Sequence, residues 1–164
     1  MLKKVDNILY KTLCYICAIL MFGMMLLIAT NVFFRYVLNN SIPWSEEAGR
    51  FMFIWMSFLG AVAAYHSHSH VALDLLLMKT KGMVLKIIRI LTEIFALAMA
   101  IGMILGGNAM VTIGLMQTSP SLRIPMQYMF SVFPISGVLL FYFAIRKIAT
   151  HVGLDQTQEG VNHG

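Results

Sequence analysis

Long apolar runs, each bounded by a few charged positions, set the pattern of this chain. The first run has 23 uncharged residues, from Thr12 to Phe34, and would measure about 34 Å as a helix. That length is enough for the hydrocarbon core of a bilayer, which is about 30 Å thick. Polar residues gather at the ends of the runs and do not follow one helix face, a pattern typical of helices that cross a membrane.

The second run is the shortest and has charged residues close to its apolar part. Its uncharged stretch, residues 51–65, would measure only about 22 Å as a helix. Extending it to residues 44–66 restores about 34 Å. The extension places Glu46, Glu47 and Arg50 at the level of the lipid headgroups or slightly below it.

The third and fourth runs each contain a feature that affects helix packing. Ala98, Gly102 and Gly106 recur every four residues, which would permit close contact with another helix; chance spacing in a glycine-rich helix explains the repeat equally well. In the fourth run, Pro134 should kink the helix, because its ring removes one backbone hydrogen bond.

These runs predict an all-α, polytopic integral membrane protein with four transmembrane helices in one membrane domain, residues 1–150, followed by a polar C-terminal tail, residues 151–164. The expected spans are residues 9–35, 44–66, 83–116 and 125–146. Only a short link separates the first two spans, so they should form an antiparallel hairpin. The mixed segment between spans two and three is compatible with an amphipathic helix lying in the membrane interface.

Composition and charge agree with a membrane protein. Hydrophobic residues make up 59% of the chain and charged residues 12%, whereas soluble domains have about 25% charged residues. Nine basic residues lie near the termini and in the central connector, against three on the opposite face, so the positive-inside rule predicts that both termini are cytoplasmic. Since the basic residues lie between apolar runs and contact membrane lipids, the net charge of +5 does not indicate nucleic-acid binding.

Charged residues also meet where the first two spans are linked. Glu46, Glu47 and Arg50 are three or four positions apart and can pair on a helix, and Arg35 ends the neighbouring span at the same membrane face. One interpretation is structural, with Ser45 capping the helix and both glutamates meeting its positive end. The other is a polar cluster that binds a partner or an ion. We predict that the cluster holds this end of the hairpin.

Histidines follow the second span. His66 and His70 would be four positions apart on a helix and could share a metal ion, but no nearby cysteine or second carboxylate completes a site. We interpret them, with His68, as interfacial residues, and a His70–Asp74 contact could fix the start of the connector. Phosphate-binding, nucleophile and metalloprotease motifs do not occur. We therefore predict no enzyme, cofactor, metal, catalytic or substrate-binding residue in this chain.

The order of motifs is specific even though each motif is loose. The stretch NVFFRYVLNNSIPWSEEAGRFMFIWMSFLGAVAAYHSHSHVALDLL has an Asn–Arg pair, a Trp-x-Glu-Glu segment, an arginine, an aromatic-rich run and a His–Asp pair, and a Ser-Pro-x-Leu-x-Ile-Pro turn follows. Over residues 5–148 this order resembles the DctQ-like small membrane subunit of tripartite ATP-independent periplasmic (TRAP) transporters. The matching candidate structural or subunit-interface residues are Asn31, Arg35, Trp44, Glu46, Glu47, Arg50, Trp55, Gly60, His70 and Asp74.

The resemblance implies a role in the bacterial inner membrane. Such subunits are expected to brace a large, DctM-like permease subunit and to help dock a DctP-like periplasmic substrate-binding protein. The large subunit would hold the sodium and substrate sites of a symporter. The transported organic acid would be a C4-dicarboxylate, sialic acid or another sugar acid.

Two other classes share some of these features. A stand-alone four-helix exporter usually needs a membrane-buried carboxylate, and Glu93, near a span end, is the only candidate. A membrane anchor of a redox complex would need haem ligands within the spans, whereas the histidines lie at span ends or in tails.

Overall fold

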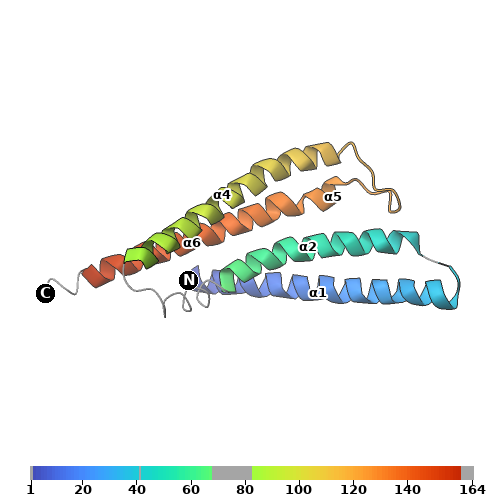
Figure 1. The fold of residues 1–164 in the computed structure, drawn as a ribbon, viewed down its shortest axis with the longest axis horizontal. Coiled ribbons are helices and arrows are strands. Elements are labelled where there is room, and N and C mark those ends of the chain that lie inside the picture. The colour runs from blue at the N-terminus through green and yellow to red at the C-terminus, as the bar shows by residue number, and fades with distance from the viewer. Residues whose placement is uncertain (1, 41, 68–82, 160–164) are drawn as a thin grey trace.

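The computed structural model describes residues 2–40, 42–67 and 83–159, and these residues are helical apart from short turns and loops. The helices of the described residues are α1 (Leu2–Val37), α2 (Pro43–Ser67), α4 (Met83–Gly114), α5 (Gln127–Phe130) and α6 (Val132–Glu159) (Figure 1). The described part of the chain contains a single isolated β-bridge and no strand. The all-α prediction is confirmed for these residues.

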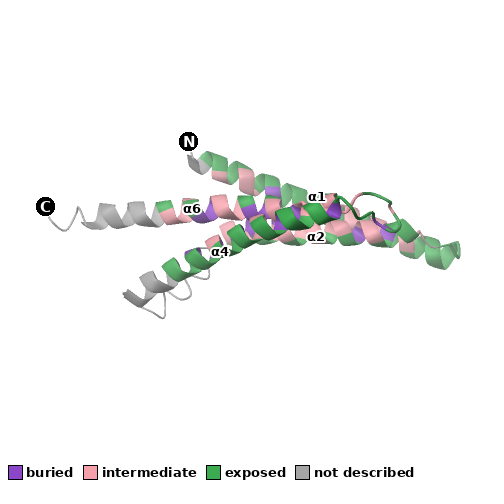
Figure 2. Cartoon of the chain, turned by 90° about the horizontal axis from the view of Figure 1, so that it is seen from above, coloured by how far each residue is buried: buried purple, intermediate pink, exposed green. Residues whose placement is uncertain are grey.

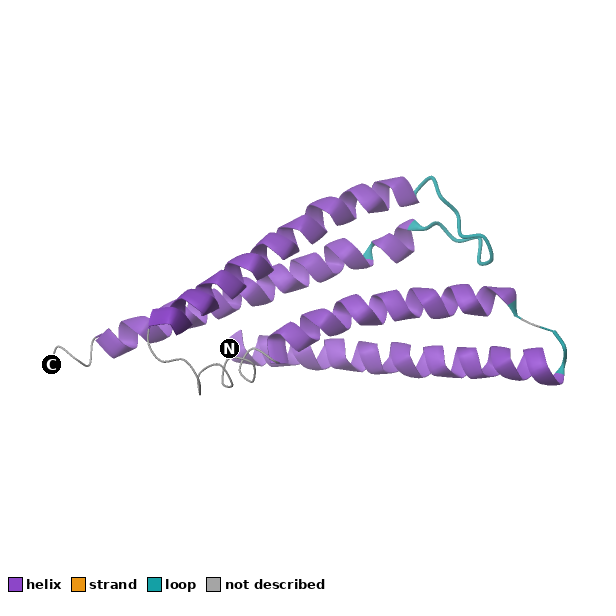
Figure 3. Cartoon of the chain, in the orientation of Figure 1, coloured by secondary structure: helices purple, strands orange, loops and turns teal. Residues whose placement is uncertain are grey.

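Two helical hairpins make up the bundle. α1 packs along α2, α4 packs along α6, and α2 joins the hairpins through contacts with α6. The α1–α2 link and the loop between α4 and α5 lie at one end, which we call the turn end; the start of α1 and the end of α6 lie toward the other, which we call the terminal end (Figures 1 and 3). This arrangement brings loops far apart in sequence to the same end.

The predicted number of membrane-length helices is confirmed. Within the part of the chain that the structure describes, four segments are long and apolar enough to span a bilayer: Lys4–Val37, Pro43–Ser67, Ile90–Gly114 and Gln127–Ala149. The first begins before the predicted residue 9, because backbone hydrogen bonding continues past the apolar run. α6 likewise continues to Glu159, through part of the segment predicted as a tail. The predicted interfacial helix falls mostly on residues 68–82, outside the described residues.

Burial is low and lies between the helices (Figure 2). Leu13 is the one buried residue among the described side chains of α1. Apolar side chains such as Phe22 and Met25, both 60% exposed, cover the rest of this helix. Such a surface suits lipid or another membrane helix as its neighbour.

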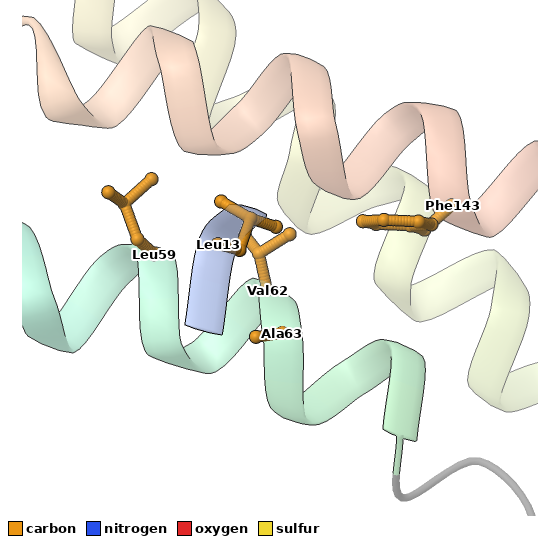
Figure 4. Close-up of a cluster of buried hydrophobic side chains, with 5 residues drawn as sticks. All are labelled: Leu13, Leu59, Val62, Ala63 and Phe143. Carbon is orange, nitrogen blue, oxygen red and sulfur yellow. The ribbon is translucent and has the colours of Figure 1, made fainter. Parts of the chain in front are cut away.

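A small apolar core joins three helices. Leu13 from α1, Leu59, Val62 and Ala63 from α2, and Phe143 from α6 form this cluster (Figure 4). Phe143 is 1% exposed. The core therefore fixes the two hairpins to each other through α2 and α6.

Close packing of α4 on α6 uses other glycines than the predicted repeat. A Cβ atom on Gly107 would lie 2.6 Å from Pro134 Cδ, and one on Gly137 would lie 2.9 Å from Ile104 Cγ1. In contrast, a Cβ atom on Gly102 or Gly106 would have no neighbour within 4 Å. Within the described chain, the repeat therefore does not form the helix contact.

The fourth span is interrupted close to Pro134. α5 and α6 meet at Ser131, whose backbone keeps helical angles (φ −62°, ψ −19°). Pro134 has no N–H and cannot donate to the carbonyl of Phe130, four residues earlier. The missing donor lies within one turn of the interruption at Ser131, while the predicted kink stays a prediction.

Candidate functional site: polar connections between the hairpins

Glu47 connects α2 to the loop between α4 and α5. Its Oε1 accepts a hydrogen bond from the Ser119 hydroxyl, and its Oε2 accepts from the backbone N–H groups of Ser121 (2.9 Å) and Leu122 (3.1 Å). We call this set, Glu47, Ser119, Ser121 and Leu122, the Glu47 latch. The latch fixes the turn ends of the two hairpins to each other.

The loop is shaped to present those N–H groups. The N–H of Ser119 donates to the Ile124 carbonyl (2.9 Å), and the N–H of Met126 donates to the Gln117 carbonyl (2.9 Å). Arg123 completes the reversal with a positive φ of 53°, a conformation that costs a non-glycine residue some strain. Successive free N–H groups in a turn form a concavity that favours an anion, which the Glu47 carboxylate provides.

A second hydrogen-bond set shapes the α1–α2 link. Asn31 Oδ1 accepts from the N–H of Ile42 (2.9 Å), and the Ser45 hydroxyl donates to the Ile42 carbonyl (2.7 Å). Asn39 supplies the turn with a positive φ of 49°. α2 begins at Pro43, a residue favoured at a first helical position. The expectation that Ser45 caps the helix is wrong, because Ser45 already lies in the first turn.

The remaining charged candidates at the turn end are not part of the latch. Arg35, Glu46 and Arg50 are exposed and form no hydrogen bond or ion pair among the residues that the structure describes. Arg50 attracts the Glu47 carboxylate electrostatically without an ion-pair contact. The Glu46–Arg50 and Glu47–Arg50 pairs that the helical spacing permits are not formed among the described residues; the Glu47 carboxylate bonds to the loop instead.

The other candidate residues are distributed along α2. Trp44 is 48% exposed at the turn end, and Trp55 packs against the apolar core. Gly60 faces α1, where an added Cβ atom would lie 3.9 Å from Cys17 Sγ. His70 and Asp74 lie outside the described residues, as does His68.

Near the terminal end, an acidic residue of α1 contacts α6. Asp6 forms an ion pair with Arg146 at 2.8 Å and accepts a hydrogen bond from the Tyr142 hydroxyl at 2.8 Å. Both side chains of the ion pair are largely shielded, with 25% and 15% of their surface exposed. Sequence reasoning did not predict this connection.

A second terminal connection joins α2, α4 and α6. The Tyr65 hydroxyl donates a hydrogen bond to Glu93, whose residue is 6% exposed. Lys147 Nζ donates to the Tyr65 carbonyl (2.6 Å) and lies 3.4 Å from the centre of the Tyr65 ring. Glu93 therefore joins the second hairpin to the first. Because its carboxylate already accepts this hydrogen bond, Glu93 is not well placed to act as the membrane-buried carboxylate of an exporter.

His66 stacks between the hairpins beside these connections. Its ring centre lies 5.3 Å from that of Tyr10 and 4.6 Å from that of Phe143. Among the described residues, no group of three or more His, Cys, Asp or Glu side chains is placed to hold a metal ion.

Comparisons with known proteins point to a single family. The family model for the DctQ component of tripartite ATP-independent periplasmic transporters matches residues 24–153. A TRAP transporter small permease protein of Haemophilus influenzae is 26% identical over 152 residues, which cover 93% of this chain and 94% of that protein.

Two further relatives carry more specific names. The C4-dicarboxylate TRAP transporter small permease protein DctQ of Vibrio cholerae is 32% identical over 92 residues, or 56% of this chain and 40% of that protein. The isethionate TRAP transporter permease protein DctMQ of Oleidesulfovibrio alaskensis is 27% identical over 111 residues, or 66% of this chain and 18% of that protein.

The described residues form four membrane-length helices that polar contacts hold together, and the chain is related to permease proteins. These features define a membrane-embedded component of a transport system. The chain belongs to the DctQ family and is a small permease component of a TRAP transporter.

Proposed function

We propose that this small permease braces a large, DctM-like permease subunit in the bacterial inner membrane. The observation that carries the proposal is the surface of α1, which has membrane length but only one buried residue among its described side chains. Most of that apolar surface is available to lipid and to a partner. The connections at both ends of the bundle keep the hairpins in one arrangement, which a bracing subunit needs.

The nature of the partner follows from the relatives. The isethionate relative carries DctM and DctQ in one name, and this chain matches only 18% of its length. This supports a DctM-like subunit as the partner here. We further propose that the complex docks a DctP-like periplasmic binding protein at the turn end, which is the periplasmic end if both termini are cytoplasmic as the positive-inside rule predicts.

The transported compound belongs to the organic acids in this proposal. Two of the relatives are named for a C4-dicarboxylate and for isethionate, and both compounds are organic anions. We place the substrate site and sodium coupling of a secondary symporter in the large subunit, and we assign neither to residues of this chain.

Co-purification followed by transport tests this function. The tagged chain, co-expressed with a DctM-like subunit, should retain that subunit in mild detergent. Proteoliposomes with the complex should take up an organic acid only when its binding protein and a sodium gradient are present. Purification of the chain as a self-sufficient dimer, or uptake by that dimer alone, would contradict the bracing role.

A further inference from the structure

A groove lies between α1 and α2 at the turn end, and its charged side chains take no part in the connections described above. Its volume is about 590 Å³. We call it the hairpin groove, and its relevant lining residues are Ile28, Asn31, Arg35, Glu46, Arg50 and Phe53. Glu47 is not part of this lining, so the groove is separate from the Glu47 latch.

Two cationic side chains converge on the hairpin groove from different helices. Arg35 lies near the end of α1 and Arg50 lies in the second turn of α2. Both are exposed and form no hydrogen bond or ion pair among the described residues. A guanidinium group presents planar donors that match a phosphate. Two guanidinium groups at the predicted membrane interface match an anionic ligand.

The groove becomes apolar with distance from the turn. Ile28 precedes Arg35 by seven residues on α1, which places it about 10 Å deeper along the helix. Phe53 follows Arg50 on α2, which runs in the opposite direction, so it also lies deeper. The groove is thus charged near the turn and apolar farther along the helices. A phospholipid has the same polarity, with its phosphate at the interface and its acyl chain in the hydrocarbon core.

The charges distinguish a lipid from a protein side chain. Glu46 places a negative charge beside the two arginines in the same lining. A headgroup with both a phosphate and an amine matches both signs, whereas a lone carboxylate from a partner would leave Glu46 without a positive counterpart. We propose that the hairpin groove binds one phosphatidylethanolamine molecule, with its phosphate at Arg35 and Arg50 and its amine at Glu46.

Native mass spectrometry of the purified full-length chain tests the site. Phosphatidylethanolamine should form adducts that diacylglycerol with the same acyl chains does not form, and inorganic phosphate should not displace them. The double substitution Arg35→Gln and Arg50→Gln should lower the adduct population by roughly tenfold or more, since charge-assisted hydrogen bonds are lost. Arg123→Gln, at the same end but outside the groove, should leave it unchanged. Should the double variant not fold, Arg35→Gln alone carries the same comparison.

Several outcomes would overturn the proposal. Equal adduct populations in the wild type and the arginine variants would exclude the site, as would equal binding of diacylglycerol. Displacement by inorganic phosphate would indicate a site for free anions. Loss of a co-purified large permease subunit with unchanged lipid adducts would assign the groove to that protein partner.

Glu46→Gln should reduce the preference for phosphatidylethanolamine over phosphatidylglycerol, and an unchanged preference would exclude the amine contact.

Discussion

At the turn end, one carboxylate joins the hairpins by accepting hydrogen bonds from a loop, and two of its three donors are backbone N–H groups. Near the terminal end, the carboxylates of Asp6 and Glu93 instead contact side chains of other helices. The same two hairpins are therefore held by one carboxylate at the turn end and, near the terminal end, by two carboxylates on different helices together with the Lys147–Tyr65 contact.

This difference has consequences for tolerance to substitution. A backbone donor is present whatever the residue, so the Glu47 latch depends on Glu47 and on the loop conformation more than on loop composition. The terminal connections depend on both partners of each pair. Because Asp6 and Glu93 lie on different helices and have different partners, loss of one should leave the other in place.

The largest effect on stability is expected from Tyr65→Phe at the terminal end. The substitution keeps the ring near Lys147 and the backbone carbonyl, but removes the hydroxyl that donates to Glu93. Loss of a hydrogen-bond donor to a buried carboxylate should cost about 1–3 kcal/mol. Thermal unfolding in detergent, followed by circular dichroism, measures the change.

Tyr15→Phe is the matched control, because Tyr15 is 69% exposed on α1. It should unfold at the wild-type temperature. If Tyr65→Phe also did so, the contact between α2 and α4 would have no part in holding the hairpins together.

A smaller and more local effect is expected from Glu47→Ala at the turn end. Removal of the carboxylate leaves the N–H group of Ser121 without its acceptor, whereas the N–H group of Leu122 keeps its 3.3 Å contact with the Ser119 hydroxyl. Hydrogen exchange in a peptide covering residues 117–126 should become roughly tenfold faster, with no change around Tyr65. Glu46→Gln is the control, since Glu46 does not contact the loop. Unchanged exchange in Glu47→Ala would show that the loop holds its conformation without the latch.

The helices could be predicted from sequence because burial in lipid requires long apolar runs and internal backbone hydrogen bonds. The second helix does extend past its apolar run, as predicted, since α2 begins at Pro43. The partners of its charged residues were not predictable from helical spacing, because Glu47 bonds to a loop 72 or more residues away in sequence.

The terminal connections were missed for a related reason. Asp6 and Arg146 lie 140 residues apart, and only the antiparallel path of the hairpins brings them together. The predicted topology placed Asp6 and Arg146 at the same membrane face, so their shared depth could have suggested that they pair. The close α4–α6 contact was missed because Gly107 and Gly137 lie on two helices, whereas the repeat that sequence reasoning considered lies on one.

Asp6→Asn should have a smaller effect on stability than Tyr65→Phe. The ion pair with Arg146 is lost, but the amide carbonyl of the new side chain can still accept from Tyr142, and the site is more exposed than that of Glu93. Thermal unfolding should show a modest decrease, and the decreases of Asp6→Asn and Tyr65→Phe should add in the double variant. A double variant much less stable than this sum would show that the terminal connections act as one unit.

The smallest effect separates the two kinds of donor within the Glu47 latch. Ser119→Ala removes the hydroxyl that donates to Oε1 of Glu47, whereas Ser121→Ala keeps the backbone N–H that donates to Oε2. Ser119→Ala should therefore speed hydrogen exchange in residues 117–126 by less than Glu47→Ala does, and Ser121→Ala should leave it at the wild-type rate. Ser121 is the matched control because it is exposed, while Ser119 is buried. If Ser119→Ala and Ser121→Ala accelerated hydrogen exchange equally, the Ser121 hydroxyl would matter as much as the Ser119 hydroxyl. That result would contradict a latch in which Ser121 takes part only through its backbone N–H.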